Sequence, residues 1–302
     1  VRAGTDGSSI ATPMSAAEAR AILEEAFLIM TRARAQIRQP LDSRAQVSIS
    51  VVDTFGAVLG VVRSPDAPVF GVDVSLQKAR TAAFFSNARA ASDLSGNGVA
   101  AVRNRLSAAQ TFFGNSNVFT GQTAWSARAI GNVARPFFPD GEVARPQGPF
   151  SVPVASFNPF STGLQSELVF DNITSHVAYL LTSGGSADTP ARCSLSPDAA
   201  PGQNRLQNGI QIFPGAVPIY RGSTLIGAIG VSGDGIDQDD MIAFLGAHNA
   251  GARIGGIGNA PAATRSDQIL VAISGASVRL RYVGCPFAPF LDTNEQNVCQ
   301  GR

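Results

Sequence analysis

Few side chains in this chain are suited to nucleophilic, acid–base or metal-binding chemistry. Among its 302 residues there are two histidines, His176 and His248, three cysteines and a single lysine, Lys78. The sequence contains no GxSxG nucleophile elbow, and the cysteines lack the CxxC spacing of a zinc or redox site. These observations disfavour hydrolase catalysis and favour a binding role, with an enzymatic role as the alternative.

Two further groups of residues resemble ligand sites but lack the spacing that such sites need. The aspartates Asp234, Asp237, Asp239 and Asp240 do not follow the ligand pattern of a calcium loop and have no closing Glu. We therefore interpret them as helix-capping and dipole-complementing residues. The glycine-rich run 251–258 does not lie between a strand and a helix, as a dinucleotide-binding loop requires, and is interpreted as an ordinary loop.

Hydrophobic periodicity predicts a long first helix. Ser15 and Glu18 form a capping-box pair ahead of apolar residues at helical spacing. Pro40 is expected to end this helix, which gives it the range 16–38.

A hairpin and a second helix are predicted next. The ranges 46–53 and 58–63 have the alternation of two strands joined by a short turn. Asp73 is expected to cap a helix that runs to about residue 85, with small residues that allow close packing on a sheet.

The middle of the chain, 86–209, has a less regular pattern that is rich in Asn, Gly, Pro and Phe. A helix over 99–113 and a strand over 164–170 are the elements expected there. Its ten Phe and Trp residues are too many for a solvated linker, so we expect the segment to be an insertion or lid that packs over apolar surface.

Regular structure returns after residue 215. A second hairpin is predicted from strands 217–220 and 224–231, followed by a helix that Asp237 caps and that ends near His248. A last hairpin, 268–273 with 278–283, is expected to turn at 274–276 before an irregular tail.

Two blocks of sequence carry a resemblance to a known family. The first comprises 48–53 through Gly56 with 77–83, and the second comprises 215–219, 226–233 and 237–239. Together they resemble the GlcG/HbpS-type haem-binding family, which includes the C-terminal domain of PduO-type adenosyltransferases.

The resemblance implies an α/β (α+β) fold, an antiparallel sheet with helices on both faces, and assembly into homo-oligomers or with a partner protein. It divides the chain into four expected parts, which are a flexible mature N-terminus (1–14), a GlcG/HbpS-like domain in two halves (15–87 and 209–250), an insertion (88–208), and a C-terminal hairpin and tail (251–302).

Haem is the cofactor that the resemblance implies, and its iron would need an axial ligand. In some family members a histidine near the first helix ligates the iron, but this chain has no histidine before His176. His176 and His248 are therefore the candidate ligands, and each is also explained as an ordinary surface residue.

Three residues of the second predicted helix are candidates for the polar end of such a ligand. Lys78 and Arg80 lie two positions apart and therefore face different directions. One of them could reach a propionate, while Thr81 offers a hydroxyl. A structural salt bridge is the alternative role for this pair.

These inferences predict an accessory protein that binds haem, a similar tetrapyrrole or another small ligand, without catalysis. A structural or assembly subunit that uses the fold to oligomerise is one alternative, and an enzyme acting on a small hydroxy acid or a corrinoid is another. A net charge of +1 gives no overall electrostatic field that would attract nucleic acid. No apolar run in the sequence approaches the roughly 20 residues that span a bilayer.

The chain start and the cysteines together predict an oxidising compartment. The first fifteen residues lack an initiator Met and an apolar signal core, as a mature terminus does after signal-peptide removal, which favours a periplasmic or extracellular location. Cys285 and Cys299 close a short loop in the irregular tail and are expected to form a disulfide, worth about 3 kcal/mol. The alternative pairs Cys193 with one of these two tail cysteines.

Overall fold

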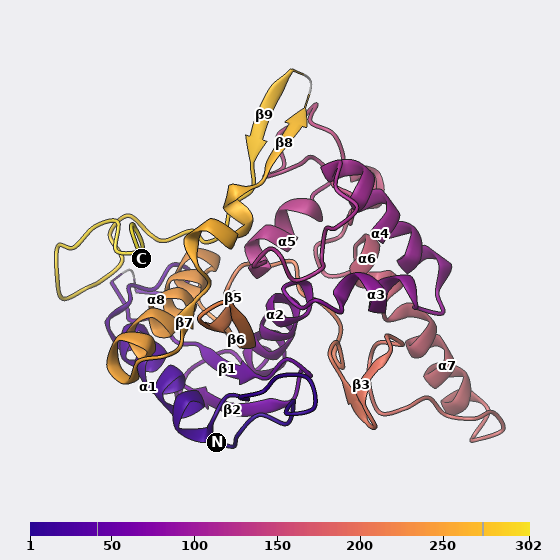
Figure 1. Cartoon of the computed structure of the whole chain (residues 1–302), viewed down its shortest axis with the longest axis horizontal. Helices are drawn as coiled ribbons and strands as arrows, with labels where there is room; N and C mark the ends of the chain where they lie inside the picture. Colours follow the sequence, from indigo (N-terminus) through magenta and orange to yellow (C-terminus); the bar gives the residue numbers. More distant parts are fainter. Residues whose placement is uncertain (41, 274) are drawn as a thin grey trace.

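A five-stranded antiparallel sheet forms the centre of the protein (Figure 1), whose computed structural model describes residues 1–40, 42–273 and 275–302. The strand order is β2-β1-β6-β5-β7. This confirms the mixed α+β fold expected from the sequence. The strands are β1 (Ser48–Val52), β2 (Val58–Arg63), β5 (Ala216–Arg221), β6 (Thr224–Ser232) and β7 (Gly258–Asn259).

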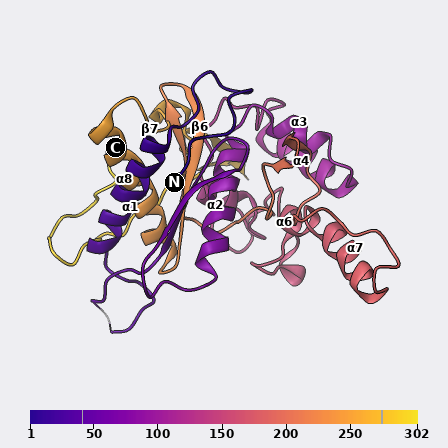
Figure 2. The ribbon, with the colours of Figure 1, turned by 90° about the horizontal axis from the view of Figure 1, so that it is seen from below.

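Helices cover both faces of the sheet, as Figure 2 shows. Helices α1 (Ala16–Arg32) and α8 (Ile236–Ile254) pack against each other on one face, and α2 (Gly71–Phe85) lies on the other. The capping box of α1 is present, because Glu18 N donates to Ser15 Oγ and Ser15 N donates to Glu18. The apolar sides of α1 and α8 bury the main hydrophobic core against the sheet.

Helix α2 lies unusually close to the sheet. A Cβ atom added at Gly230 in β6 would lie 2.1 Å from Ser75 O and 2.6 Å from Ala79 N of the helix. Ser75 and Ser50 also share a buried hydrogen bond between their hydroxyls, at 2.6 Å. The orientation of α2 is therefore fixed by contacts that leave no room for a side chain at Gly230.

The segment between the two halves of the sheet packs around an aromatic cluster of its own. Phe119 lies 4.8 Å from Trp125 and 5.5 Å from Phe150 between ring centroids, and all three are buried. The elements of this segment are α3 (Ala90–Ser95), α4 (Ala100–Phe113), α5 (Ala127–Val133), α6 (Gly163–Glu167), α7 (Phe170–Leu181), β3 (Asp198–Ala200) and β4 (Gln203–Asn204).

The strand expected over 164–170 is wrong, because this range is helical in α6 and at the start of α7. Leu164 and Leu168 are both buried and lie four positions apart, which places them on one side of a helical turn. A short apolar run does not distinguish a strand from a buried helix by periodicity alone.

Two helices end at other places than the sequence predicted. Helix α1 ends at Arg32 and not at residue 38, because Ala33 is extended and pairs with Phe290 of the C-terminal tail. Helix α8 continues to Ile254, so the first part of the glycine-rich run 251–258 is helical and not loop.

The expected side-chain caps of α2 and α8 are also corrected. The N-cap residues are Phe70 and Gly235, and neither makes a side-chain capping bond. Asp73 and Asp237 instead lie in the first turns of their helices.

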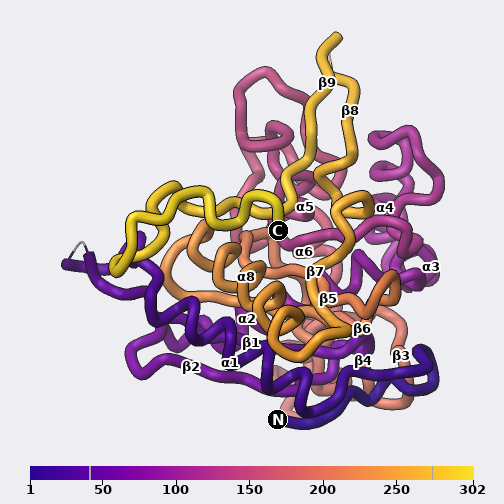
Figure 3. The backbone as a smooth tube through the Cα atoms, turned by 60° about the vertical axis from the view of Figure 1, so that its left-hand side comes forward, coloured from indigo at the N-terminus to yellow at the C-terminus, as the bar shows by residue number. Residues whose placement is uncertain are grey.

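The C-terminal region forms a hairpin and an irregular tail (Figure 3). Strands β8 (Leu270–Ile273) and β9 (Ala276–Arg279) pair as a hairpin. The predicted bounds of the second strand are wrong, because β9 begins two residues and ends four residues earlier than expected and includes Ala276 of the expected turn. Ser274 of that turn lies outside the described residues. Cys285 and Cys299 are joined by a disulfide, which is the pairing that their spacing predicted, and Cys193 is free and exposed.

Short 3₁₀ turns and the N-terminal segment complete the described structure. The turns are Val154–Ser156, Ala262–Thr264 and Ser266–Gln268. The segment 1–14, expected to be flexible, lies along the β1–β2 hairpin, where Arg2 N donates to Leu59 O and Asp6 accepts from Thr54 N. Across the described ranges, none of the helices has both the length and the apolar character to traverse a bilayer.

A substitution at Gly230 tests the close packing of α2 on the sheet. We expect Gly230→Ala to lower the free energy of unfolding by about 1–3 kcal/mol, because the added methyl group meets helix backbone that cannot move aside cheaply. Gly258→Ala is the matched control, since a Cβ there has no neighbouring atom within 4 Å. Urea unfolding followed by circular dichroism measures both, and equal stability of the two variants would contradict the close packing.

Candidate functional site

A groove of about 690 Å³ lies between α2, α7 and the irregular segment 188–193. Apolar side chains form much of its lining, namely Val58, Leu76, Ile173, Val177, Pro190 and Ala191. Its polar lining includes His176, Arg80, Asp188 and Cys193. The groove thus combines an apolar surface with a few convergent polar groups, which is typical of small-molecule sites.

His176 lies on α7 and faces this groove with its side chain half exposed. Its Nδ1 lies 2.7 Å from Asp188 Oδ1, and this bond lowers the pKa of the Asp188 carboxyl. When Nδ1 carries the proton that it donates to the carboxylate, Nε2 is left with a free lone pair. A carboxylate that orients a histidine in this way is typical of metal-ligating histidines.

Arg80 lies on the α2 side of the same groove and is almost completely buried. Its Nε donates to Gly56 O at 2.9 Å, and its two Nη atoms donate to Asn208 Oδ1 at 2.5 Å and to Gln207 Oε1 at 3.3 Å. Burial lowers the pKa of Arg80, and the nearby Asp73 and Asp53 oppose this shift. Within the described residues no carboxylate forms a salt bridge with Arg80. Arg80 is therefore a buried cation whose partners are all neutral, which suits an incoming anion.

Lys78 and Thr81 do not reach the groove. Lys78 Nζ donates to Asp239 Oδ2 at 2.8 Å and to Val231 O at 2.9 Å, and the lysine is only 2% exposed. Thr81 Oγ1 donates to Gln77 O and accepts a hydrogen bond from the main chain of Gln211. Lys78 therefore forms the structural salt bridge. Of the three candidate residues, only Arg80 lines the groove.

His248 lies apart from the groove, on α8 at the opposite face of the sheet. It is also not at the helix C-terminus, as the sequence suggested, because α8 continues for six more residues to Ile254. Desolvation and the nearby Arg302 and Arg265 lower the pKa of His248. The two histidines therefore lie on different parts of the fold, and only His176 lines the groove together with Arg80.

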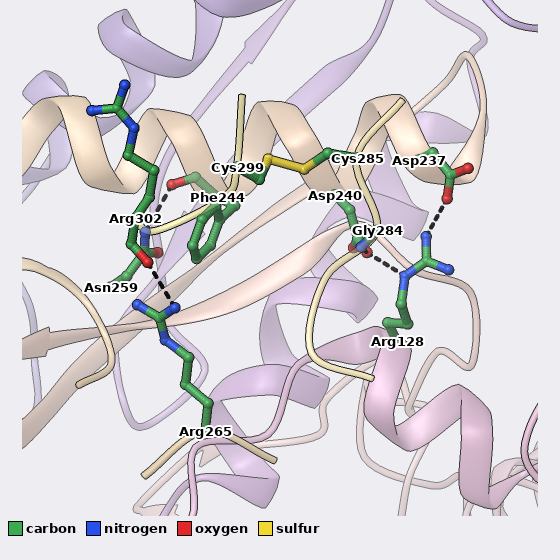
Figure 4. Close-up of a disulfide and its surroundings, with 10 residues drawn as sticks. All are labelled: Arg128, Asp237, Asp240, Phe244, Asn259, Arg265, Gly284, Cys285, Cys299 and Arg302. Atoms are coloured by element: carbon green, nitrogen blue, oxygen red, sulfur yellow. Dashed lines mark hydrogen bonds and ion pairs between the residues drawn. A yellow bond between two sulfur atoms is a disulfide. The ribbon is translucent and has the colours of Figure 1, made fainter. Parts of the chain in front are cut away.

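The aspartates of the acidic cluster form ion pairs and do not cap the helix, and Figure 4 shows two of them, Asp237 and Asp240, with their shared partner Arg128. Asp240 is fully buried and accepts from Arg128 Nε at 2.5 Å and from Gly284 N at 2.9 Å. Arg128 also pairs with Asp237. This network joins α8 to the middle segment through Arg128 and to the tail through Gly284, beside the disulfide.

Several groove residues could not be identified from the sequence. Asp188, Cys193 and Asn208 lie in irregular segments with no motif, and only the fold brings them beside α2. Burial raises the pKa of the Cys193 thiol, an effect to which Asp73 adds. In the sequence, only the polar pair Gln207–Asn208, shortly before the second half of the sheet, could have indicated groove residues in these irregular segments.

Comparison with known proteins gives one family match. A family model described as "Haem degrading protein HbpS-like" matches residues 22–125 and 164–248, together more than half of the chain. The matched ranges extend into the segment 88–208 from both sides and include the helix that carries His176. No curated protein matches the chain.

Two solved structures are similar to the chain at low identity. The PduOC:Heme complex is 16% identical over 81% of this chain and 94% of that chain, with a TM-score of 0.31. Protein ORFY of Klebsiella pneumoniae is 17% identical over 83% of this chain and 93% of that chain, with a TM-score of 0.34. The family assignment rests on the family model and not on these two superpositions.

The structural role of Lys78 predicts how its loss acts. Burial raises the pKa of Asp239 from 3.8 to about 6, although Lys78 opposes this shift. Removing the lysine in Lys78→Met leaves a buried carboxylate without its cation, which we expect to cost about 3–5 kcal/mol near neutral pH.

The pH dependence of that loss has a definite sign. A folded-state pKa above the unfolded value means that the folded protein holds the proton more tightly, so stability falls as pH rises from 3.8 towards the folded pKa. The penalty of Lys78→Met should therefore be smaller at pH 5 than at pH 8, and Lys78→Met/Asp239→Asn should recover part of it. A pH-independent penalty in urea unfolding would contradict the assignment.

Proposed function

The chain belongs to the HbpS-like family of haem-degrading proteins, and from this premise we propose that it binds haem or a similar tetrapyrrole in the groove between α2 and α7. The observation that carries the proposal is the pairing, within one groove, of a carboxylate-oriented histidine with a buried arginine that has no carboxylate partner. Each is the kind of group that the metal and the acidic edge of a tetrapyrrole require.

The size and lining of the groove support this ligand class. Its volume of about 690 Å³ lies within the range of roughly 300–1,000 Å³ that is typical of ligand pockets. Ile173 and Val177 lie one helical turn apart on α7 and face Leu76 of α2 across the groove. An apolar macrocycle placed between the two helices would remove these side chains from water.

His176 is the residue that would hold the iron. Asp188 keeps its Nδ1 engaged, which leaves Nε2 as the ligating atom and fixes the plane of the ring. Haem bound in this way would supply an iron centre with redox and ligand-binding chemistry.

Arg80 would orient the ligand. Its guanidinium is fixed by Gly56 O, Asn208 and Gln207, so little side-chain entropy is lost when it pairs with a carboxylate. The propionates of a haem would therefore point towards α2 and its iron towards α7.

We further propose that the chain acts as an accessory binding protein in an oxidising compartment. The support for the compartment is the Cys285–Cys299 disulfide of the tail. Self-association through Phe170, Leu180 and Leu181, which α7 exposes, is the alternative role, and a monomeric mass in light scattering at micromolar concentration would contradict it.

The disulfide provides a test of the compartment proposal. We expect non-reducing peptide mapping of the natively produced protein to recover Cys285 linked to Cys299, and Cys285→Ser to lower the free energy of unfolding by about 3 kcal/mol because the tail loop opens. Cys193→Ser is the control and should leave stability unchanged, since Cys193 is exposed and unpaired. Three free thiols in the native protein would overturn the proposal.

Titration with haemin, followed by the Soret absorbance, tests the proposed ligand and its site. We expect saturable uptake at one equivalent for the unaltered chain and loss of the axial-ligand spectrum in His176→Ala. Asp188→Asn should weaken binding about tenfold, because the ring loses its orienting carboxylate. His248→Ala is the matched control and should bind as the unaltered chain does.

Three outcomes would count against the proposal in different ways. No saturable uptake would remove haem binding altogether. Uptake that needs His248 and not His176 would move the site to α8. Bleaching of the bound haem after addition of ascorbate would show degradation in place of an accessory binding role.

A further inference from the structure

A second, smaller cavity adjoins the groove at Arg80. It has a volume of about 270 Å³ and is bounded by Arg2, by the turn 55–58 and by the segment 202–207. Val58, Arg80 and Gln207 line both this cavity and the groove, so the Arg80 guanidinium lies between them.

The two arginines of this cavity are anchored in the same way. Arg80 Nε donates to Gly56 O at 2.9 Å, and Arg2 Nε donates to Val58 O at 2.7 Å. Each guanidinium is thus fixed through Nε to a main-chain carbonyl where the β1–β2 turn leads into β2. Across the described ranges, the Nη atoms of Arg2 have no protein acceptor, whereas those of Arg80 contact only neutral amide oxygens.

Among the described residues, neither Arg2 nor Arg80 forms a salt bridge with a carboxylate. None of the side chains that line it is acidic. Asp73 and Asp53 lie close enough to raise the pKa of Arg80, against the larger effect of burial, but neither contacts its guanidinium. The two carboxylate oxygens of Asp53 accept hydrogen bonds from Thr5 and from the main-chain N–H groups of Phe55 and Ala57. Two arginines facing one cavity without a carboxylate form an arrangement that recognises oxyanions.

We propose that this cavity binds a small oxyanion, a carboxylate or a phosphate, between Arg2 and Arg80. Gln203, whose amide also lines the cavity, would add a hydrogen-bond donor or acceptor. The oxyanion has two possible sources, which are a free small anion in solution and the carboxylate arm of a ligand whose apolar body lies in the groove. The anion site itself does not depend on haem being that ligand.

Calorimetric titration with inorganic phosphate, and separately with citrate, tests the site at low ionic strength, where screening is weak. We expect saturable binding to the unaltered chain and an affinity about tenfold lower for Arg2→Gln, which loses charge-assisted hydrogen bonds. Arg2 is exposed, so this variant should fold, which a thermal melt checks. Arg279→Gln is the matched control, an exposed arginine with one main-chain acceptor and no cavity.

Three results of this titration would overturn the proposal. Absence of saturable binding, an unchanged affinity in Arg2→Gln, or an equal loss in Arg279→Gln would each show that no built anion site exists. His176→Ala should bind phosphate as the unaltered chain does, so failure of haem binding and failure of the anion site are separate results.

A second titration distinguishes the two sources. If a carboxylate arm from the groove occupies the cavity, phosphate should compete with haemin, and Arg2→Gln should weaken haemin but not haemin dimethyl ester, whose propionates are blocked. If a free anion occupies the cavity, phosphate should leave the affinity for haemin unchanged.

Discussion

Helix α2 lies on the sheet with its backbone against the backbone of β6 at Gly230, and no side chain could fit between them. This contact sets the rotation of the helix about its own axis. Lys78 is thereby directed to the buried Asp239, while Arg80, two residues further on, is directed to Gly56 O and the groove. The packing of α2 at Gly230 thus explains both the buried salt bridge of Lys78 and the position of Arg80 at the groove.

The middle segment provides the other wall of the groove and is itself held by several contacts. Its aromatic cluster packs around Phe85 at the end of α2, and Arg105 pairs with Glu167 to hold α4 against α6. Gln77 of α2 donates to Asn208 O, which ties the segment before β5 to the same helix. The fold therefore places His176 and Arg80 on separate elements across an apolar space, as an amphipathic ligand with a metal centre would require.

The elements that the sequence predicted well are those governed by local signals. The capping box began α1 at the right residue, and strand alternation placed β1, β2, β5 and β6 within one or two residues. The end of α1 was mispredicted because Ala33 pairs with Phe290, more than 250 residues away. Asp240 was misinterpreted for the same reason, since its partner Arg128 lies in a distant segment. Of the candidate site residues, the sequence supplied His176 and Arg80 but not the geometry that unites them.

We propose above that the groove between α2 and α7 holds a tetrapyrrole whose iron His176 would bind. A crystal structure of the chain crystallised with haemin tests this most directly. We expect iron at coordinating distance from His176 Nε2, the ring against Ile173 and Val177, and at least one propionate on Arg80. Haem bound instead on the α1–α8 face beside His248, or bound without contact to α7, would contradict it.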